Sequence, residues 1–223
     1  HRAAGRQGSV SVQETVRTSV DPERRLKVAR SHTAAHLLHW ALRKVLGPEA
    51  VQAGSYVETE RVRFDFSSLS GLREEQRHEV EALVNSRVRL GDAVRADEMR
   101  LEDAKRTGAL ALFGEKYGGT VRVVTIGDYS KELCGGTHLL HTGFVGRFAI
   151  LGESSIAAGT RRLEALVGET ATARQQQFFL GFLELVLGAG ELVARDEALF
   201  EERLKVLVFL AQALRLFLRP LQR

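Results

Sequence analysis

Two pairs of potential metal ligands, about a hundred residues apart, constrain this chain more than any other feature. His32 and His36 stand four residues apart, and Cys134 precedes His138 at the same spacing. On a helix, residues four apart lie about 40° apart around the axis and about 6 Å along it, so two such imidazoles can share one ion. A thiolate with imidazole nitrogens is a donor set that suits zinc. The two pairs together therefore predict a zinc site that joins distant parts of the chain.

Each pair has a neighbouring histidine that offers an alternative ligand. His39 follows His36 by three residues, and His141 follows His138 by three. On a helix, His39 would stand about 10 Å from His32 along the axis, so it would chelate only with His36. We therefore favour the first histidine of each repeat. Either pair alone would also fit an amphipathic helix or a buried cysteine, and a closed four-ligand shell is typical of structural zinc.

The composition indicates a soluble globular chain of one or two domains. Of 223 residues, 44% are hydrophobic and 27% are charged, which provides an ample core. The net charge of +4 is compatible with a polyanionic partner and equally with a solvated surface. A single cysteine excludes an internal disulfide and favours a cytoplasmic location, and neither a secretory leader nor an 18-residue apolar run is present. Because the chain begins at His1, we interpret it as an excised piece of a longer protein.

The pattern along the chain predicts an α+β fold with a mixed or antiparallel sheet. Asp21-Pro22 is typical of a helix start and Gly47-Pro48 of a helix stop, and the helix between them allows a break near Arg30. Further helices are expected at 70–89, capped by Ser70, and at 101–106, with strands at 56–58, 61–66, 120–126, 144–151 and 161–167. Without a regular βαβ repeat, these elements are expected to pack around a zinc-site cleft.

Two flanking segments differ in character from the central one. Residues 9–20 alternate as in a strand that needs partners, so we assign 1–20 to a partial β segment. Apolar residues at 178–187, an interruption at Gly188–Gly190 and a heptad seam at 200–218 predict a C-terminal helical hairpin or coiled coil over 169–223. This region is expected to pack on itself or to form a homodimer, and not to enter a membrane, because polar residues interrupt it. The remaining unit is 21–168.

Several blocks in a fixed order extend beyond the metal ligands. They are RSHTAAHLLH at 30–39, VQAGS at 51–55, RFDF at 63–66, ALFGEKY at 111–117, VRVVTIGD at 121–128, ELCGGTH at 132–138, TG at 142–143 and GTRRLE at 159–164. Together they resemble the editing domain of alanyl-tRNA synthetase over about residues 10–168. The family's motifs for alanine activation are absent from this sequence. The resemblance implies hydrolysis of serine or glycine wrongly esterified to the 3′-terminal adenosine of tRNA for alanine.

The resemblance also implies roles for individual residues. Zinc would be held by the four residues named above, which would also form the catalytic centre: His32, His36, Cys134 and His138. Gly135 and Gly136 would let the backbone approach the substrate and the ion. Arg161 matches a position near the substrate, and at most one of Arg161 and Arg162 should point into the site. Contacts with the tRNA acceptor end are expected from Lys116, Tyr117 and Arg162, although the first two would equally close a hairpin.

An aminoacyl ester is already activated, so the chemistry needs mainly a placed water and stabilisation of an oxyanion. Zinc would either lower the pKa of a bound water or hold the substrate while a free water attacks. To spare alanine, the site needs a buried polar group that pairs with the serine hydroxyl and is left unpaired by alanine. Thr33 and Gln52 are the candidates, and Gln52 also matches a pocket position of the family.

Three other functions fit the same residues. They are a free-standing deacylase that edits in trans, a threonyl-tRNA type of editing domain, and a zinc-stabilised RNA-binding module without enzymatic activity. In each case the expected partner is tRNA or another RNA rather than DNA.

Overall fold

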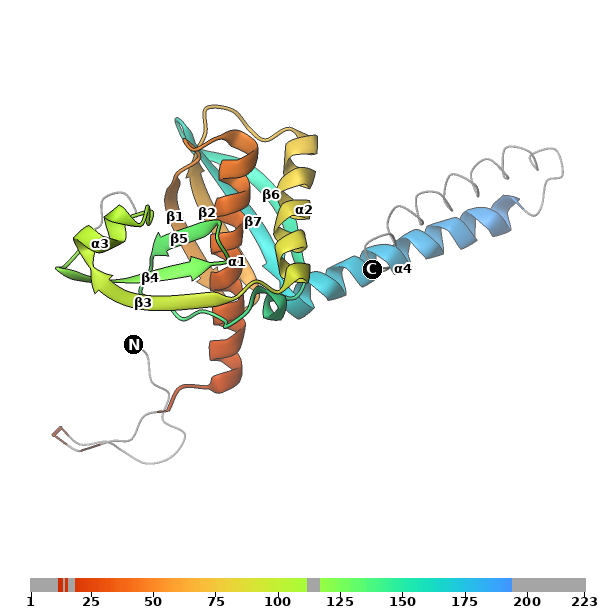
Figure 1. The fold of residues 1–223 in the computed structure, drawn as a ribbon. Helices are drawn as coiled ribbons and strands as arrows, with labels where there is room; N and C mark the ends of the chain where they lie inside the picture. The colour runs from red at the N-terminus through yellow and green to blue at the C-terminus, as the bar shows by residue number, and fades with distance from the viewer. Residues whose placement is uncertain (1–11, 14, 16–18, 112–116, 194–223) are drawn as a thin grey trace.

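The computed structural model describes residues 12, 13, 15, 19–111 and 117–193, with side chains to residue 182 (Figure 1). The helices are α1 (Pro22–Leu46), α2 (Glu74–Leu90), α3 (Leu101–Arg106), the 3₁₀ helix η1 (Thr142–Val145) and α4 (Gly168–Val193). The strands are β1 (Gln52–Glu58), β2 (Arg61–Ser67), β3 (Val94–Arg100), β4 (Thr120–Ile126), β5 (Ser130–Leu133), β6 (Phe148–Ala157) and β7 (Thr160–Val167). Most of the strand expected at 9–20, all of the heptad seam at 200–218 and Lys116 lie outside the described residues.

Two antiparallel sheets form the β part of the described chain. One has the strand order β1-β2-β7-β6, and the other has the order β3-β4-β5. Helix α1 lies between them, with α2 beside it, and α4 extends away from this body (Figure 1). The expected α+β class with antiparallel sheets is therefore confirmed. Within the described residues, no helix combines the length and hydrophobicity needed to cross a bilayer.

Helix α1 carries the first histidine pair and begins where the sequence predicts. The Asp21 carboxylate accepts hydrogen bonds from the backbone N–H groups of Glu23 and Arg24, at 3.0 and 3.2 Å. Gly47 follows the last helical residue with φ +113°, a conformation that side chains resist. The helix runs without a break through Arg30, so the break considered there is wrong. Neither glycine nor proline interrupts the backbone ladder after Pro22.

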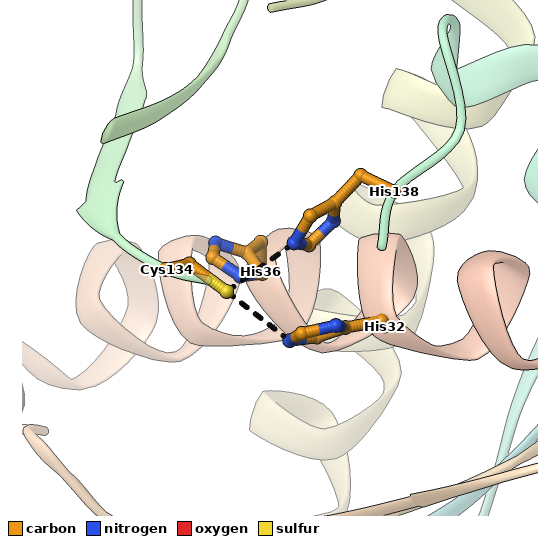
Figure 2. A group of neighbouring side chains, drawn as sticks. All are labelled: His32, His36, Cys134 and His138. Atoms are coloured by element: carbon orange, nitrogen blue, oxygen red, sulfur yellow. Dashed lines mark hydrogen bonds between the residues drawn. The ribbon is translucent and has the colours of Figure 1, made fainter. Parts of the chain in front are cut away.

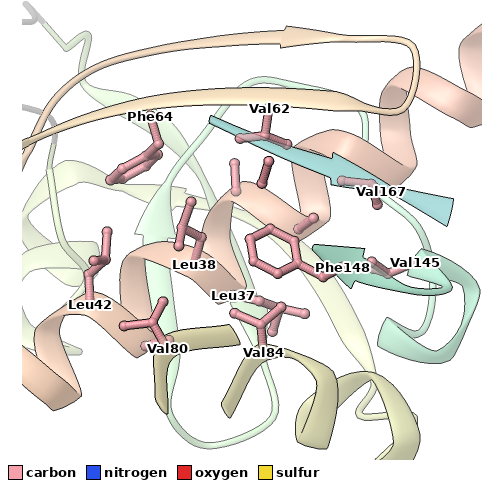
Figure 3. Close-up of a cluster of buried hydrophobic side chains, with 14 of the residues drawn as sticks. Leu37, Leu38, Leu42, Val62, Phe64, Val80, Val84, Val145, Phe148 and Val167 are labelled. Atoms are coloured by element: carbon pink, nitrogen blue, oxygen red, sulfur yellow. The ribbon is translucent and has the colours of Figure 1, made fainter. Parts of the chain in front are cut away.

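The core lies between α1, α2 and the inner face of the four-stranded sheet (Figure 3). Val62, Phe64 and Phe66 alternate along β2 and are at most 1% exposed, as their period of two predicts. Helix α1 contributes Leu37 and Leu38, both fully buried. A smaller cluster joins Ala104, Val121, Val123 and Leu133, and Tyr117 packs against it.

Several expected boundaries are wrong for local reasons. Ser70 does not cap α2, which begins after Arg73, where the Gln76 side chain accepts the Arg73 backbone N–H at 3.1 Å. The strand expected from residue 144 begins at Phe148, because η1 occupies the preceding turn. Helix α4 continues through Gly188–Gly190, where an interruption was expected. Strands β3 and β5 were not predicted, since one is largely exposed and the other has four residues.

Replacement of Phe148 with alanine is expected to lower the free energy of unfolding by about 3–5 kcal/mol, because this ring is fully buried. Phe144 offers a matched control, since this residue is 61% exposed. Its replacement with alanine is expected to change the free energy by less than about 0.5 kcal/mol. Urea denaturation of both variants measures the difference, and equal losses would contradict the position of Phe148 in the core.

Candidate metal centre

Four side chains from distant parts of the sequence meet beside α1 (Figure 2). His32 and His36 lie one turn apart on α1, Cys134 follows β5, and His138 lies in the loop that leads to η1. One donor atom from each residue lies within 4.8 Å of the others. The Cys134 sulfur lies 3.4 Å from Nε2 of His32 and 3.3 Å from Nε2 of His138. The convergence that the sequence predicts is therefore present in the structure.

The donor set fits a zinc ion. With Zn–N near 2.0–2.1 Å and Zn–S near 2.3 Å, the donors of a tetrahedral site lie about 3.3–3.7 Å apart. The two sulfur–nitrogen distances, 3.4 and 3.3 Å, agree with this range. Without a metal, these distances are contacts between a thiol and two imidazoles. In a site that holds zinc, they would be distances between neighbouring ligands of the ion. One thiolate and three imidazoles form a donor set typical of zinc.

Each of the three imidazoles also has a polar neighbour within the protein. Nδ1 of His138 lies 3.3 Å from the Thr33 hydroxyl, and Nδ1 of His36 lies 3.3 Å from the Glu132 carboxylate. The latter pair is within ion-pair distance but lacks hydrogen-bond alignment. His32 forms a hydrogen bond with the backbone of Thr137. In metal sites, contacts of this kind orient the coordinating imidazoles, and here they would leave the remaining ring nitrogens to bind an ion.

Glu132 is a functional candidate that the sequence reasoning missed. Its side chain is 7% exposed and also lies 3.0 Å from Nδ1 of His39, so one carboxylate serves two histidines. Burial alone raises the pKa of Glu132, but the adjacent His36 and His39 and the Ser130 hydroxyl bring this pKa below its usual value. The carboxylate is therefore ionised at neutral pH. Together with a Cys134 thiolate, it would balance the two positive charges of a zinc ion.

The three imidazoles of the group favour the neutral form that a metal requires. Burial, followed by the charge of His36, lowers the pKa of His32 to about 4. Burial, followed by the charges of His36 and His32, lowers the pKa of His138 to about 2. Burial also lowers the pKa of His36, although Glu132 opposes this shift. Protons therefore compete weakly with a metal ion for these nitrogens near neutral pH.

The metal-free chain is expected to lose stability as the pH falls from about 6.5 towards 4. Histidines of the unfolded chain take up protons near pH 6.5, whereas His32, with its pKa lowered to about 4, remains neutral in the folded chain. Because only the unfolded state takes up protons in this pH range, a fall in pH stabilises that state and lowers the free energy of unfolding. Urea denaturation at about pH 7.5 and about pH 5 measures this loss. Equal stability at the two pH values would contradict the buried neutral imidazoles.

Two variants test the source of this pH dependence. His32→Gln is expected to reduce it, because the substituted side chain takes up no proton in either state. His78 is 73% exposed on α2, and His78→Gln is expected to keep the wild-type dependence.

The two glycines after Cys134 differ in their surroundings. A Cβ atom on Gly136 would lie 2.0 Å from Cε1 and 2.4 Å from Nδ1 of His32. A Cβ atom on Gly135 would meet nothing within 4 Å. Gly136 is therefore required for the loop to pack against a metal ligand, whereas Gly135 borders open space.

The two residues expected to recognise a serine hydroxyl have contacts within the protein. The Thr33 hydroxyl is fully buried and, besides His138, accepts the backbone N–H of Leu139 at 3.1 Å. The Gln52 side-chain amide donates to the Ser55 hydroxyl at 3.0 Å. Thr33 thus lies directly behind a ligand and fixes its ring. A direct contact of either residue with substrate remains a prediction.

Arg161 and Arg162 lie on opposite faces of β7, as their alternation predicts. Arg161 shares the face of Phe66 and donates from Nε to Glu153 at 2.5 Å. Arg162 forms two hydrogen bonds with the Asp65 carboxylate, at 2.7 and 2.8 Å. Both guanidinium groups therefore have carboxylate partners within the protein, and their expected contacts with substrate and tRNA remain predictions.

The two alternative histidines lie outside the group of four. His39 is 3% exposed and directs Nδ1 to Glu132, with its ring 5.5 Å from that of Phe64. His141 is exposed, with its ring 6.2 Å from that of Phe144. The structure thus gathers the first histidine of each repeat, as the spacing favours.

Part of the chain matches a known family of domains. Residues 121–164 match the threonyl and alanyl tRNA synthetase second additional domain. This segment includes Cys134 and His138, and α1 supplies the other two members of the group.

The chain is similar to alanine–tRNA ligases over a longer stretch. It is 52% identical over 166 residues to alanine–tRNA ligase 1 of Lachnoclostridium phytofermentans, a match that covers 74% of this chain and 19% of the relative. The alanine–tRNA ligase of Methylacidiphilum infernorum is 56% identical over 151 residues, covering 67% of this chain and 16% of the relative. That of Pseudoalteromonas translucida is 48% identical over 167 residues, covering 75% and 19%. The resemblance to alanyl-tRNA synthetase is therefore confirmed, and the chain spans about a fifth of the length of these relatives.

Proposed function

We propose that residues 21–168 form a zinc-dependent editing domain that hydrolyses serine or glycine esterified to tRNA for alanine. The single observation that carries this proposal is the convergence of His32, His36, Cys134 and His138 in a segment similar to alanine–tRNA ligases. A zinc ion there would supply a Lewis acid able to polarise a bound oxygen or to hold the substrate. We further propose that the domain acts on the tRNA acceptor end in the cytoplasm, where a reduced thiol persists.

The chain's own residues support ester chemistry through positioning. Thr33 and the Thr137 backbone form hydrogen bonds with two of the imidazoles, and the Glu132 carboxylate lies beside the third, so the rings are oriented before a substrate arrives. Beside it, the open space at Gly135 leaves the backbone accessible. Because the aminoacyl ester is already activated, a positioned water and stabilisation of the oxyanion suffice, and a serine nucleophile is not required.

The experiment that tests this proposal compares serine-charged and alanine-charged tRNA for alanine, incubated with the chain with and without a zinc chelator. Hydrolysis of the serine ester, sparing of the alanine ester and loss of activity with chelator are the expected results. Equal hydrolysis of both esters would contradict the selectivity, and activity unaffected by the chelator would contradict the metal centre.

A zinc-stabilised RNA-binding module is a second candidate, because four protein ligands are typical of structural zinc. It predicts that chelation lowers the unfolding temperature while neither ester is hydrolysed. Thermal unfolding in the presence of chelator, measured alongside the deacylation assay, separates the two functions.

A further inference from the structure

Arg122 lies directly against the loop that carries two of the four metal-site residues. It belongs to β4, and its backbone carbonyl accepts the N–H of Cys134 at 3.0 Å, one residue beyond the end of β5. Its side chain turns to the same loop. Nη1 donates to the carbonyl of Cys134 at 2.9 Å and to the carbonyl of Gly136 at 2.7 Å. One guanidinium nitrogen therefore holds both ends of the segment 134–136.

The side-chain partners of Arg122 are backbone carbonyl groups. Among the described residues, no salt bridge joins it to a carboxylate, whereas Arg161 and Arg162 each have one. A guanidinium presents several donors in fixed directions, and the two hydrogens on Nη1 match two separate acceptors. The geometry thus ties the arginine to the metal-site loop itself rather than to a neighbouring acidic side chain.

The same loop also packs closely against His32. Gly136, whose carbonyl is one of the two that accept from Arg122, lies so near the His32 ring that an added Cβ atom would overlap it. A small shift of the loop would therefore move the Cys134 sulfur and also alter the packing against His32. The Arg122 side chain reaches this loop from β4, whereas His32 reaches it from α1.

We propose that Arg122 is a positioning residue that sets the metal-site loop, and thereby the affinity and coordination geometry of the zinc centre. This inference rests on the proposed zinc centre and adds a residue to which no role was assigned. Arg122 acts through the carbonyls of Cys134 and Gly136 and does not itself need to contact the metal or the substrate.

The test measures metal binding in Arg122→Met and Arg122→Lys with zinc and with cobalt(II), whose absorption reports thiolate coordination. The Met side chain keeps much of the length but donates nothing, and we expect a loss of zinc affinity of about 10–100-fold, as for other outer-shell partners. The lysine ammonium donates from a different position, so a smaller loss is expected. In both variants the cobalt spectrum should differ from that of the wild type. Arg95 is exposed on the neighbouring strand β3, and Arg95→Met is expected to match the wild type.

Outcomes for the variants and for the wild type are distinguishable. Wild-type affinity and an unchanged cobalt spectrum in both Arg122 variants would overturn the inference, even where zinc binding and deacylation by the wild type support the proposed function. Absence of zinc binding by the wild type would overturn the zinc centre and this inference with it. If circular dichroism shows that Arg122→Met does not fold, the decision rests on Arg122→Lys, whose affinity and spectrum must differ from the wild type.

Discussion

Replacement of Cys134 with alanine is expected to abolish hydrolysis of serine-charged tRNA and to lower zinc affinity by more than about 100-fold. The reason is that Cys134 provides the only thiol of the chain and the one donor that becomes anionic in the group of four. Since loss of an outer-shell partner alone costs about 10–100-fold, loss of a ligand is expected to exceed that range. Zinc titration and the deacylation assay measure the two effects.

The fold is expected to survive this change, because Cys134 is only half-buried and lies at the margin of the core. Circular dichroism checks this point. His141→Ala serves as the control for damage to the 134–141 segment, since His141 is exposed and outside the group. Normal deacylation by Cys134→Ala, or an equal loss in His141→Ala, would rule out a catalytic centre at these four residues.

Gly136→Ala is expected to lower zinc affinity by at least about 10-fold, whereas Gly135→Ala should leave it unchanged. The two substitutions are chemically identical and adjacent, and neither glycine has the positive φ that alanine would resist. They differ in space, because the added methyl group would lie 2.0 Å from the His32 ring at Gly136 and would meet no atom within 4 Å at Gly135. Displacement of the ring moves a ligand out of place.

Isothermal titration of the two glycine variants with zinc, at a pH where both are folded, measures this difference. A similar affinity in both variants would mean that the loop does not pack against His32 as the structure has it. A loss of zinc affinity in Gly135→Ala alone would contradict the open space beside Gly135.

Much of the fold was predictable where local signals agree with tertiary packing. Asp21 and Gly47 mark the two ends of α1, and the alternation of Val62, Phe64 and Phe66 specifies the buried face of β2. The bounds of α3 and β4 agree with the prediction. Strand β3 was not predicted, because most of its residues are exposed and the sequence therefore shows no alternation of apolar and polar residues. Its strand conformation depends on pairing with β4.

The four donor residues of the candidate site could be predicted from the sequence, but the residues that position them could not. Four ligands follow from residue type and spacing, and these also favour His36 over His39. Glu132 and Arg122 carry no such signal, because a lone carboxylate or arginine in a strand is most often exposed. Their roles depend on the pairing of β4 with β5 and on the approach of that sheet to α1, which only the three-dimensional structure provides.

The most direct test of this account is a crystal structure of the chain with zinc, with anomalous diffraction recorded at the zinc absorption edge. The account predicts one peak per chain, bonded by the Cys134 sulfur and by one nitrogen each of His32, His36 and His138. A map without a peak between these four side chains, or with zinc held by other residues, would contradict it.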